Sequence, residues 1–507
     1  MTVTVPGTTS GTPVTLAAGT GDVLNLAAAL GFLLQNSISG GSTPTPATVG
    51  SGVVGSTVTA SGGVFNSIVL QPGGGAINAN IAGNVSVVAS NTTTSDTLRG
   101  TDVAILTNTV GGSYAVTGNS TIAATGGNNT IAASGAFLVS AGSGNDIVSV
   151  TGSGTVATGG GTNTVNAAGA AGTNVQIQSQ GTNDVVLIGA GNANISLSGI
   201  GATVFAGTGS TTVNASGTNS AIGLSSGNDT VKTSGANNTT FAGTSLATIT
   251  DTGTGNAIGG FTGAIVVSAS GANSVIYANT GALNAFMSGS GDTINGGLST
   301  LINATMTGAA NAFGASTGIS NLLISGANGS VFGGALGSTL NVDLAGANAV
   351  ASLFIGNTNM TLGGGGAVVA GSTGTLNLTA TGIGTDTISL YTGAATINAG
   401  TANLFVIGSA GALNFVGGSG ASTVIAGSGG NETLTGGVGA ETFEFTNLSK
   451  NATIANFSTF DTLALQGVTV SNETFNSPGA YVVTLSDGVV ITFTGATSDP
   501  NTHIRIV

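Results

Sequence analysis

The sequence predicts an all-β fold: a β-solenoid (a β-roll or β-helix-like stack) of half-coils of about nine residues, closed by a C-terminal β cap. Three observations lead to this prediction. Aliphatic residues recur every nine residues, the composition suits thin coils of small side chains, and proline is missing from a long central span. A unit this short excludes helical repeats, which need about 30 residues or more.

Aliphatic residues set the period. Six of them each lie nine residues after the last: Val186, Ile195, Val204, Val213, Ile222 and Val231. Upstream, the period continues, with slips of one or two residues, through Val175, Val165, Val156, Val148, Leu138, Ile131 and Ile122. Alternating triplets such as Thr212-Val213-Asn214 direct the aliphatic residue inward. Two units make one coil of about 18 residues, with a strand on each side of a flat core.

Composition supports the same fold. Gly accounts for 90 residues, 40% of residues are hydrophobic and 4% are charged, whereas a typical soluble domain is about 25% charged. A helix with so much Gly, Thr and Asn would lose up to about 1 kcal/mol per residue. No proline lies between Pro72 and Pro478. Because proline has no N–H to donate to a ladder, this span is what an uninterrupted stack requires.

We expect three segments. Residues 1–48 hold an apolar stretch and a linker, residues 49–430 form the repeat array, and residues 431–507 form a cap. The apolar stretch is too short to span a bilayer. It either caps the first open coil or docks on a neighbouring molecule to build a polymer. Its candidate assembly residues are Val23, Leu24, Leu26, Leu30, Phe32, Leu33 and Leu34.

The expected cap has longer strands and more aromatic residues than the array. The alternating runs 480–485 and 489–493 are joined through Asp487-Gly488, a typical hairpin signal. The cap is therefore predicted to contain a β-hairpin and an aromatic core.

The run from Gly436 to Glu444 resembles the nonapeptide G-G-x-G-x-D-x-U-x of RTX (hemolysin-type) calcium-binding proteins. Residues 141–149 (AGSGNDIVS) match it except at the first Gly, and 226–231 (SGNDTV) match it less well. The resemblance implies export by a type I ABC transporter that reads an uncleaved C-terminal signal. It places the protein outside the cell, secreted or associated with the cell surface.

The resemblance also implies calcium, with Asp146, Asp229, Glu432 and Glu441 as candidate ligands. Ca²⁺ takes six to eight oxygen ligands, in which carboxylates supply the charge. One coil of 18 residues from Asp146 lie Asn128 and Thr164, and 18 before Glu441 lies Thr423, so no ladder of carboxylates is expected. We therefore expect a few weak calcium sites, with stacked Asn, Ser and Thr bonding along the remaining coils.

Several function classes are excluded or disfavoured. Arg99, Lys232, Lys450 and Arg505 are the four basic residues, too few for nucleic acid and a poor match for anionic membranes. His503 is the one histidine, and the array's acids are dispersed, so neither a catalytic triad nor a paired-carboxylate site is expected. We predict that the chain is not an enzyme.

The leading functional hypothesis is a secreted structural protein that binds copies of itself and forms filaments, a surface layer or biofilm matrix. The hypothesis rests on the small number of charged residues in the chain, which leaves little electrostatic repulsion between copies. The alternative is a monomeric adhesin that binds a cell-surface polysaccharide or a host surface. A third hypothesis, ice binding, rests on Thr-x-Thr triplets at 107–109, 162–164 and 248–250, which lack a steady spacing.

Overall fold

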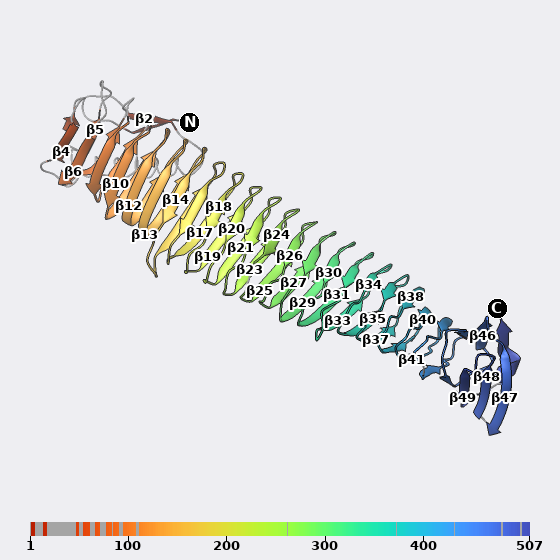
Figure 1. The fold of residues 1–507 in the computed structure, drawn as a ribbon. Helices are drawn as coiled ribbons and strands as arrows, with labels where there is room; N and C mark the ends of the chain where they lie inside the picture. Colours follow the sequence, from red (N-terminus) through yellow and green to blue (C-terminus); the bar gives the residue numbers. More distant parts are fainter. Residues whose placement is uncertain are drawn as a thin grey trace. The chain divides into compact units, whose positions relative to one another are not determined.

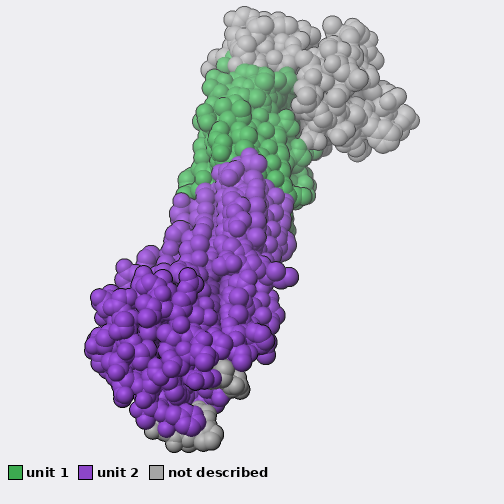
Figure 2. All heavy atoms as spheres, turned by 90° about the vertical axis from the view of Figure 1, so that its right-hand side faces the viewer, with its two compact units in different colours: residues 1–253 green, residues 254–507 purple. Residues whose placement is uncertain are grey.

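The computed structural model describes every residue from 95 to 507 except 108–110, 261, 372, 430, 478–479 and 497–498, and within residues 1–94 it describes the strands. The chain divides into two compact units, residues 1–253 and 254–507 (Figure 2). Each unit is a parallel β-solenoid (Figure 1), in which most strands pair with the strand two further along the chain. The predicted fold class is confirmed.

Each coil of unit 1 contributes one strand to each of two sheets. Sheet 1 contains β4 (Val54–Ala60), β6 (Asn78–Gly83), β8 (Thr97–Thr101), β10 (Ser113–Thr117), the first parts of β12 (Thr130–Ser140) and β13 (Ile147–Thr158), β14 (Thr164–Ala167), β16 (Val185–Ile188), β18 (Thr203–Phe205), β20 (Ala221–Gly223) and β22 (Thr239–Phe241). Sheet 2 contains β3 (Ala47–Val49), β5 (Asn66–Leu70), β7 (Val85–Ser90), β9 (Ala104–Thr107), β11 (Asn119–Ala124), the last parts of β12 and β13, β15 (Asn174–Ser179), β17 (Asn192–Leu197), β19 (Thr211–Ala215), β21 (Asp229–Thr233) and β23 (Ala247–Asp251). A separate antiparallel pair joins β1 (Thr2–Val5) and β2 (Val14–Ala17).

Unit 2 repeats this arrangement. Its sheet 1 contains β24 (Ala257–Gly259), β26 (Val275–Tyr277), β28 (Thr293–Asn295), β30 (Ala312–Gly314), β32 (Ser330–Phe332), β34 (Val350–Ser352), β36 (Val368–Ala370), β38 (Thr385–Ser389), β40 (Asn403–Ile407), β42 (Ser422–Ile425), β44 (Glu441–Thr446), β46 (Thr462–Gln466) and β50 (Ile504–Ile506). Its sheet 2 contains β25 (Ile265–Ala269), β27 (Leu283–Met287), β29 (Leu301–Met306), β31 (Ile319–Ile324), β33 (Thr339–Leu344), β35 (Asn357–Leu362), β37 (Thr375–Ala380), β39 (Ala395–Asn398), β41 (Leu413–Val416), β43 (Glu432–Thr435), β45 (Ala452–Ala455) and β49 (Val490–Thr494).

The core is the layer between the two sheets. All six residues of the nine-residue series are 0% exposed, and they alternate between sheet 1 and sheet 2. Val186 pairs with Val204, and Val204 pairs with Ile222, so one coil here takes 18 residues. Leu138 was wrongly assigned to the core: it is 37% exposed and Val139 is buried in its place. The nine-residue period alone does not show which of two adjacent aliphatic residues faces the core. Because successive side chains of a strand point to opposite faces, only one of the two can be buried.

Glycine shapes the two longest strands. β12 and β13 run from sheet 1 into sheet 2, and Gly135 and Gly152 lie opposite each other where they bend. Their φ angles are 87° and 120°, a region that side chains with a Cβ rarely adopt. A Cβ on Gly152 would also lie 2.1 Å from the carbonyl oxygen of Gly135. The bend therefore requires glycine.

Pairing changes from parallel to antiparallel within the segment predicted as a cap. β47 (Val470–Ser477), β48 (Ala480–Leu485) and β49 form an antiparallel meander, and Gly488 has a φ of 88° in the turn before β49. Buried Phe443, Phe457 and Phe493 pack together, with ring centroids 6.4 and 5.3 Å apart. The predicted hairpin and aromatic core are both present.

The short 3₁₀ helix η1 (Pro500–His503) precedes β50. Among the described residues, no helix is long and apolar enough to cross a membrane. The candidate assembly residues Val23, Leu24, Leu26, Leu30, Phe32, Leu33 and Leu34 lie outside the described residues.

Candidate functional site

The four predicted calcium ligands are buried and lie at the start of four different strands, of which only those of Glu432 and Glu441 are consecutive along the chain. Asp146, Asp229, Glu432 and Glu441 are 0%, 3%, 1% and 1% exposed. Asp146 precedes the first residue of β13, Asp229 begins β21, Glu432 begins β43 and Glu441 begins β44, so they belong to four different coils.

Each of these carboxylates accepts a backbone hydrogen bond. Asp146 accepts from the N–H of Asn129 (2.9 Å) and Asp229 from that of Thr211 (2.8 Å). Glu432 accepts from Gly427 (2.8 Å) and Glu441 from Gly437 (3.1 Å). A buried N–H without an acceptor is costly, so these acids satisfy the backbone where the ladder turns.

Asp146 and Glu441 belong to a column of buried polar side chains at the start of the sheet 1 strands. In this polar column, most side-chain oxygens accept the N–H of the equivalent residue one coil earlier, whereas Glu441 accepts that of Gly437 in its own turn. Asn129 donates to Asp146, Asp146 to Asn163 and Asn163 to Asp184, at 2.9, 3.0 and 2.7 Å. Its buried members include Asn129, Asp146, Asn163, Asp184, Ser220 and Asn238 in unit 1, and Ser274, Asp292, Asn311, Asp386, Glu441 and Asp461 in unit 2.

Most of the polar column was missed from the sequence, although a local signal marks it. In unit 1, Asn183, Asn219 and Asn237 have φ angles of 57°, 58° and 56° and immediately precede Asp184, Ser220 and Asn238. Asparagine tolerates this left-handed conformation better than most residues. The motif Gly-x-Asn followed by Asp, Asn or Ser, just before a strand, marks part of the column, including Asn129, Asp184 and Asn238, but it does not mark Asp146 or Asn163.

The expected neighbours of Asp146 and Glu441 were wrong by register. Asp146 lies between Asn129 and Asn163, because these coils have 17 residues. Glu441 lies opposite Ser422 and next to Asp461, whose Oδ1 accepts the N–H of Glu441 at 3.0 Å. Glu441 and Asp461 are therefore one pair of carboxylates in successive coils, and the pair does not continue to the preceding coil, where Ser422 lies opposite Glu441.

Burial raises the pKa of these acids because it penalises the charged form. It raises the pKa of Asp146 and Asp386, and it brings the pKa of Asp229 and of Glu432 to about 6. Burial, assisted by the neighbouring Asp461, raises the pKa of Glu441 to about 7. The protonated form of Glu441 is therefore favoured in the folded chain relative to that of an exposed glutamate.

Among the described residues, no three His, Cys, Asp or Glu side chains lie close enough together to hold a metal ion. The second oxygens of Asp146, Asp386, Glu432 and Glu441 are buried and have no hydrogen-bond partner. Calcium binding at Asp146, Asp229, Glu432 and Glu441 stays a prediction.

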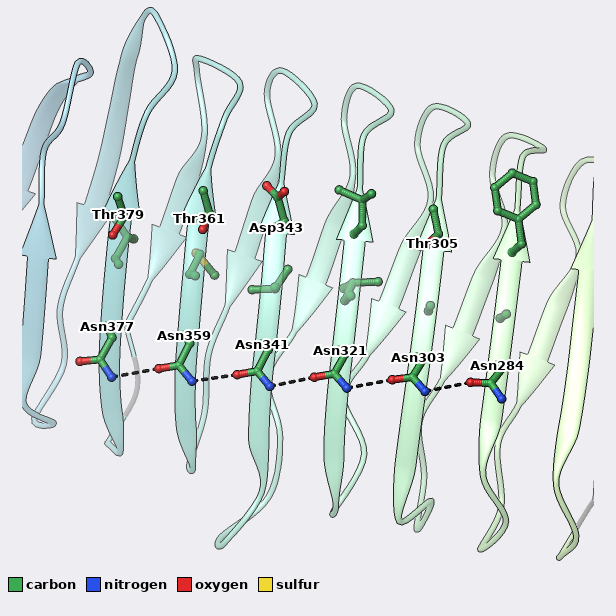
Figure 3. Close-up of a pocket in the computed structure, with 18 of the residues that line it drawn as sticks. Asn284, Asn303, Thr305, Asn321, Asn341, Asp343, Asn359, Thr361, Asn377 and Thr379 are labelled. Carbon is green, nitrogen blue, oxygen red and sulfur yellow. Dashed lines mark hydrogen bonds between the residues drawn. The ribbon is translucent and has the colours of Figure 1, made fainter.

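A long open groove of about 1000 Å³ crosses the outer face of sheet 2 in unit 2, from β25 to β39. One row of its side chains is an asparagine ladder, in which each Nδ2 donates to the Oδ1 of the previous coil (Figure 3). The bonds joining Asn303, Asn321, Asn341 and Asn359 to the preceding Asn are each 2.8 Å, and that of Asn377 is 3.0 Å. The ladder begins at Asn284.

A second row lies two residues further along each strand and points to the same side. Figure 3 shows Thr305, Asp343, Thr361 and Thr379 in this row. By register, Phe286 precedes Thr305, and Leu323 lies between Thr305 and Asp343. We call the two rows together the asparagine groove. They display amide and hydroxyl groups, one acid and an aromatic ring that is 48% exposed.

The Thr-x-Thr triplets do not form a repeating face in the described part of unit 1. Thr248 and Thr250 lie on β23, but the paired positions on β21 are Thr230 and Lys232. In the triplet 162–164 the central Asn163 is buried within the polar column. The remaining triplet includes positions outside the described residues.

His503 lies in the cap, where its ring is 6.3 Å from that of Phe457.

In comparisons with known proteins, no family model, no curated protein and no solved structure matches this chain.

Proposed function

We propose that this chain is a secreted, non-enzymatic structural protein that assembles with copies of itself into extracellular filaments, a surface layer or biofilm matrix. The observation that carries the proposal is the surface of residues 254–430, which combines a line of exposed apolar side chains with almost no charge.

The apolar line lies where the chain turns from sheet 1 to sheet 2 in unit 2. Leu336 is 84% exposed, Tyr391 65%, Leu298 61% and Phe354 57%. We call this the apolar corner; its residues are Leu298, Ile319, Leu336, Phe354, Ile355 and Tyr391. Single exposed apolar residues are common, but a line of them marks a surface that favours association.

Charge does not oppose contact between copies at this surface. Residues 254–430 contain three charged side chains, Asp292, Asp343 and Asp386. Asp292 and Asp386 are buried. With one exposed charge over so many residues, like-charge repulsion between two copies of this region is small, and low net charge promotes association.

Export through a type I ABC transporter belongs to the same proposal. It is supported by the resemblance of residues 436–444 to the RTX nonapeptide. Glu441 belongs to that stretch, and its stacked partner Asp461 follows it in the next coil. This pair is the first place to look for a weak calcium site.

The test is negative-stain electron microscopy and sedimentation of the purified full chain, compared with the variant Leu336→Lys/Phe354→Lys. We expect long fibres or sheets from the unmodified chain and mostly single particles from the variant. Assembly should persist at high salt, because few charges are available to screen. Ile383→Lys is the matched control, since Ile383 is 93% exposed in a turn from sheet 2 to sheet 1. Single particles from the unmodified chain in every condition would reject the proposal.

A second candidate function, adhesion to a polysaccharide, is supported by a different surface. The asparagine groove is open, nearly uncharged and rich in hydrogen-bonding groups, as a neutral sugar polymer would require.

A further inference from the structure

The asparagine ladder leaves hydrogen-bonding capacity facing outward. An Asn side chain has two N–H donors and an oxygen with two lone pairs. Within the ladder, Asn303, Asn321 and Asn341 each use one N–H and one acceptor position on their neighbours, at 2.8 Å. Each interior member therefore keeps one N–H and one lone pair for a ligand.

The ladder also holds these groups in place before any ligand arrives. Each interior amide is bonded on both sides, so its rotation is restricted. Ordering free side chains on binding costs conformational entropy, and a side chain that is already fixed avoids much of that cost. The result is a row of fixed donor–acceptor pairs at the strand spacing of about 4.8 Å.

The chemistry of the groove selects its ligand. Asp343 is the acid in the second row, and the residues lining the groove include no Lys, Arg or His, so an anionic polymer gains nothing there. The hydroxyl groups of Thr305, Thr361 and Thr379 run parallel to the amides. Phe286, at one end, offers a ring face on which a sugar can stack.

The shape of the groove selects an extended chain. It spans eight strands of sheet 2, from β25 to β39, or roughly 34 Å at the spacing of stacked strands. A β-1,4-linked glycan is extended, presents hydroxyl groups along both edges, and has a sugar length close to that spacing. Successive sugars can therefore meet successive coils.

We infer that the asparagine groove of unit 2 is a binding site for a neutral, extended β-1,4-linked glycan that runs along the stack. The amides of Asn303, Asn321 and Asn341 bond to its hydroxyl groups, and Phe286 stacks on a sugar at one end. This inference deepens the adhesin function and does not depend on self-assembly.

Affinity electrophoresis in gels that contain hydroxyethyl cellulose tests the inference, with alginate gels as the anionic comparison. The carrier is the full chain with Leu336→Lys/Phe354→Lys, so that a failure to assemble does not affect the result. We expect retardation by the cellulose derivative and none by alginate. The change Asn321→Leu/Asn341→Leu should weaken retardation about tenfold or more, as expected for the loss of several hydrogen bonds.

Two further variants keep the test decisive. Asn194→Leu is the matched control. Asn194 faces outward on β17, outside the groove, and its paired neighbours are Gln176 and Thr212. The retardation of this variant by the cellulose derivative should be unchanged. Phe286→Ala leaves the ladder intact and should weaken retardation severalfold even if the double Asn variant does not fold. No retardation by the cellulose derivative, equal retardation by alginate, or full retardation of the Phe286 variant would overturn the inference.

Discussion

Individual side chains in this solenoid replace parts of the backbone ladder at the turns. The buried oxygens of Asp146, Asn163 and Asp184 accept N–H groups that would otherwise be buried without a partner. The residue before Asp184, Asn183, adopts a φ of 57° that makes the turn tight enough for this contact. A polar residue at this position therefore supplements the backbone ladder in many coils, whereas others, such as those with Ala202 and Ala349, place a buried alanine there.

Replacing Asp146 tests this role. Asp146→Ala leaves the N–H of Asn129 buried without its acceptor, so it should lower the free energy of unfolding by about 1–3 kcal/mol. Asp146→Asn keeps an acceptor oxygen and should cost less than about 1 kcal/mol. Urea unfolding measures both, and equal losses for the two variants would contradict the assigned role.

The raised pKa values predict how stability changes with pH. The folded pKa of Glu432 is about 6 and that of Glu441 about 7, both above the ordinary 4.5. The folded chain thus binds these protons more tightly than the unfolded chain. Their contribution to stability is complete below about pH 4 and is lost as the pH rises to about 7.

We therefore expect a higher Tm at pH 5 than at pH 8, measured by circular dichroism. Glu441→Gln removes one of the titrating groups and should flatten the profile between pH 5 and pH 7. Asp343→Asn is a suitable control, because Asp343 is exposed in the asparagine groove and should leave the profile unchanged. A Tm that rises steadily from pH 5 to pH 8 would contradict the assigned protonation.

At the scale of elements, two kinds of strand make the coils. Most strands are short and end at a turn, whereas β12 and β13 continue through a bend from one sheet to the other. The bend depends on Gly135 and Gly152, whose positive φ and close backbone contact exclude a Cβ.

Gly152→Ala should therefore destabilise unit 1. The side chain would be strained at a φ of 120° and would approach the oxygen of Gly135 at 2.1 Å, so we expect a loss of about 1–3 kcal/mol or more. Gly160→Ala is the control, since a Cβ there meets nothing within 4 Å. Chemical unfolding compares the two, and a Gly152 variant as stable as the Gly160 variant would show that the bend does not need glycine.

At the scale of the whole molecule, the stack is held by backbone ladders and a thin aliphatic core, with buried acids satisfied by N–H groups. Most coils should therefore fold without calcium. We expect a chelator to leave the circular dichroism spectrum and the Tm of the purified chain nearly unchanged. Unfolding on chelation would show instead that calcium supports the array, as in two-state metal-dependent folds.

The sequence by itself determined the fold class and, between residues 122 and 231, the position of nearly all the core residues that the period named. Val186, Ile195 and Val204 were predicted from the period alone and are fully buried, because alternation and a nine-residue spacing leave a single way to hide them. The hairpin at Asp487-Gly488 was predicted for the same kind of local reason, since the turn chemistry is contained in two residues.

Tertiary structure alone decided which residues of different coils meet. Coils of 17 to 21 residues shift the register, so the partners of Asp146 and Glu441 could not be obtained by counting 18. The asparagine groove arises in the same way: Asn303, Asn321 and Asn341 are 18 and 20 residues apart, yet they align in one row. Backbone pairing between coils sets that alignment, and turns of variable length absorb the difference in sequence.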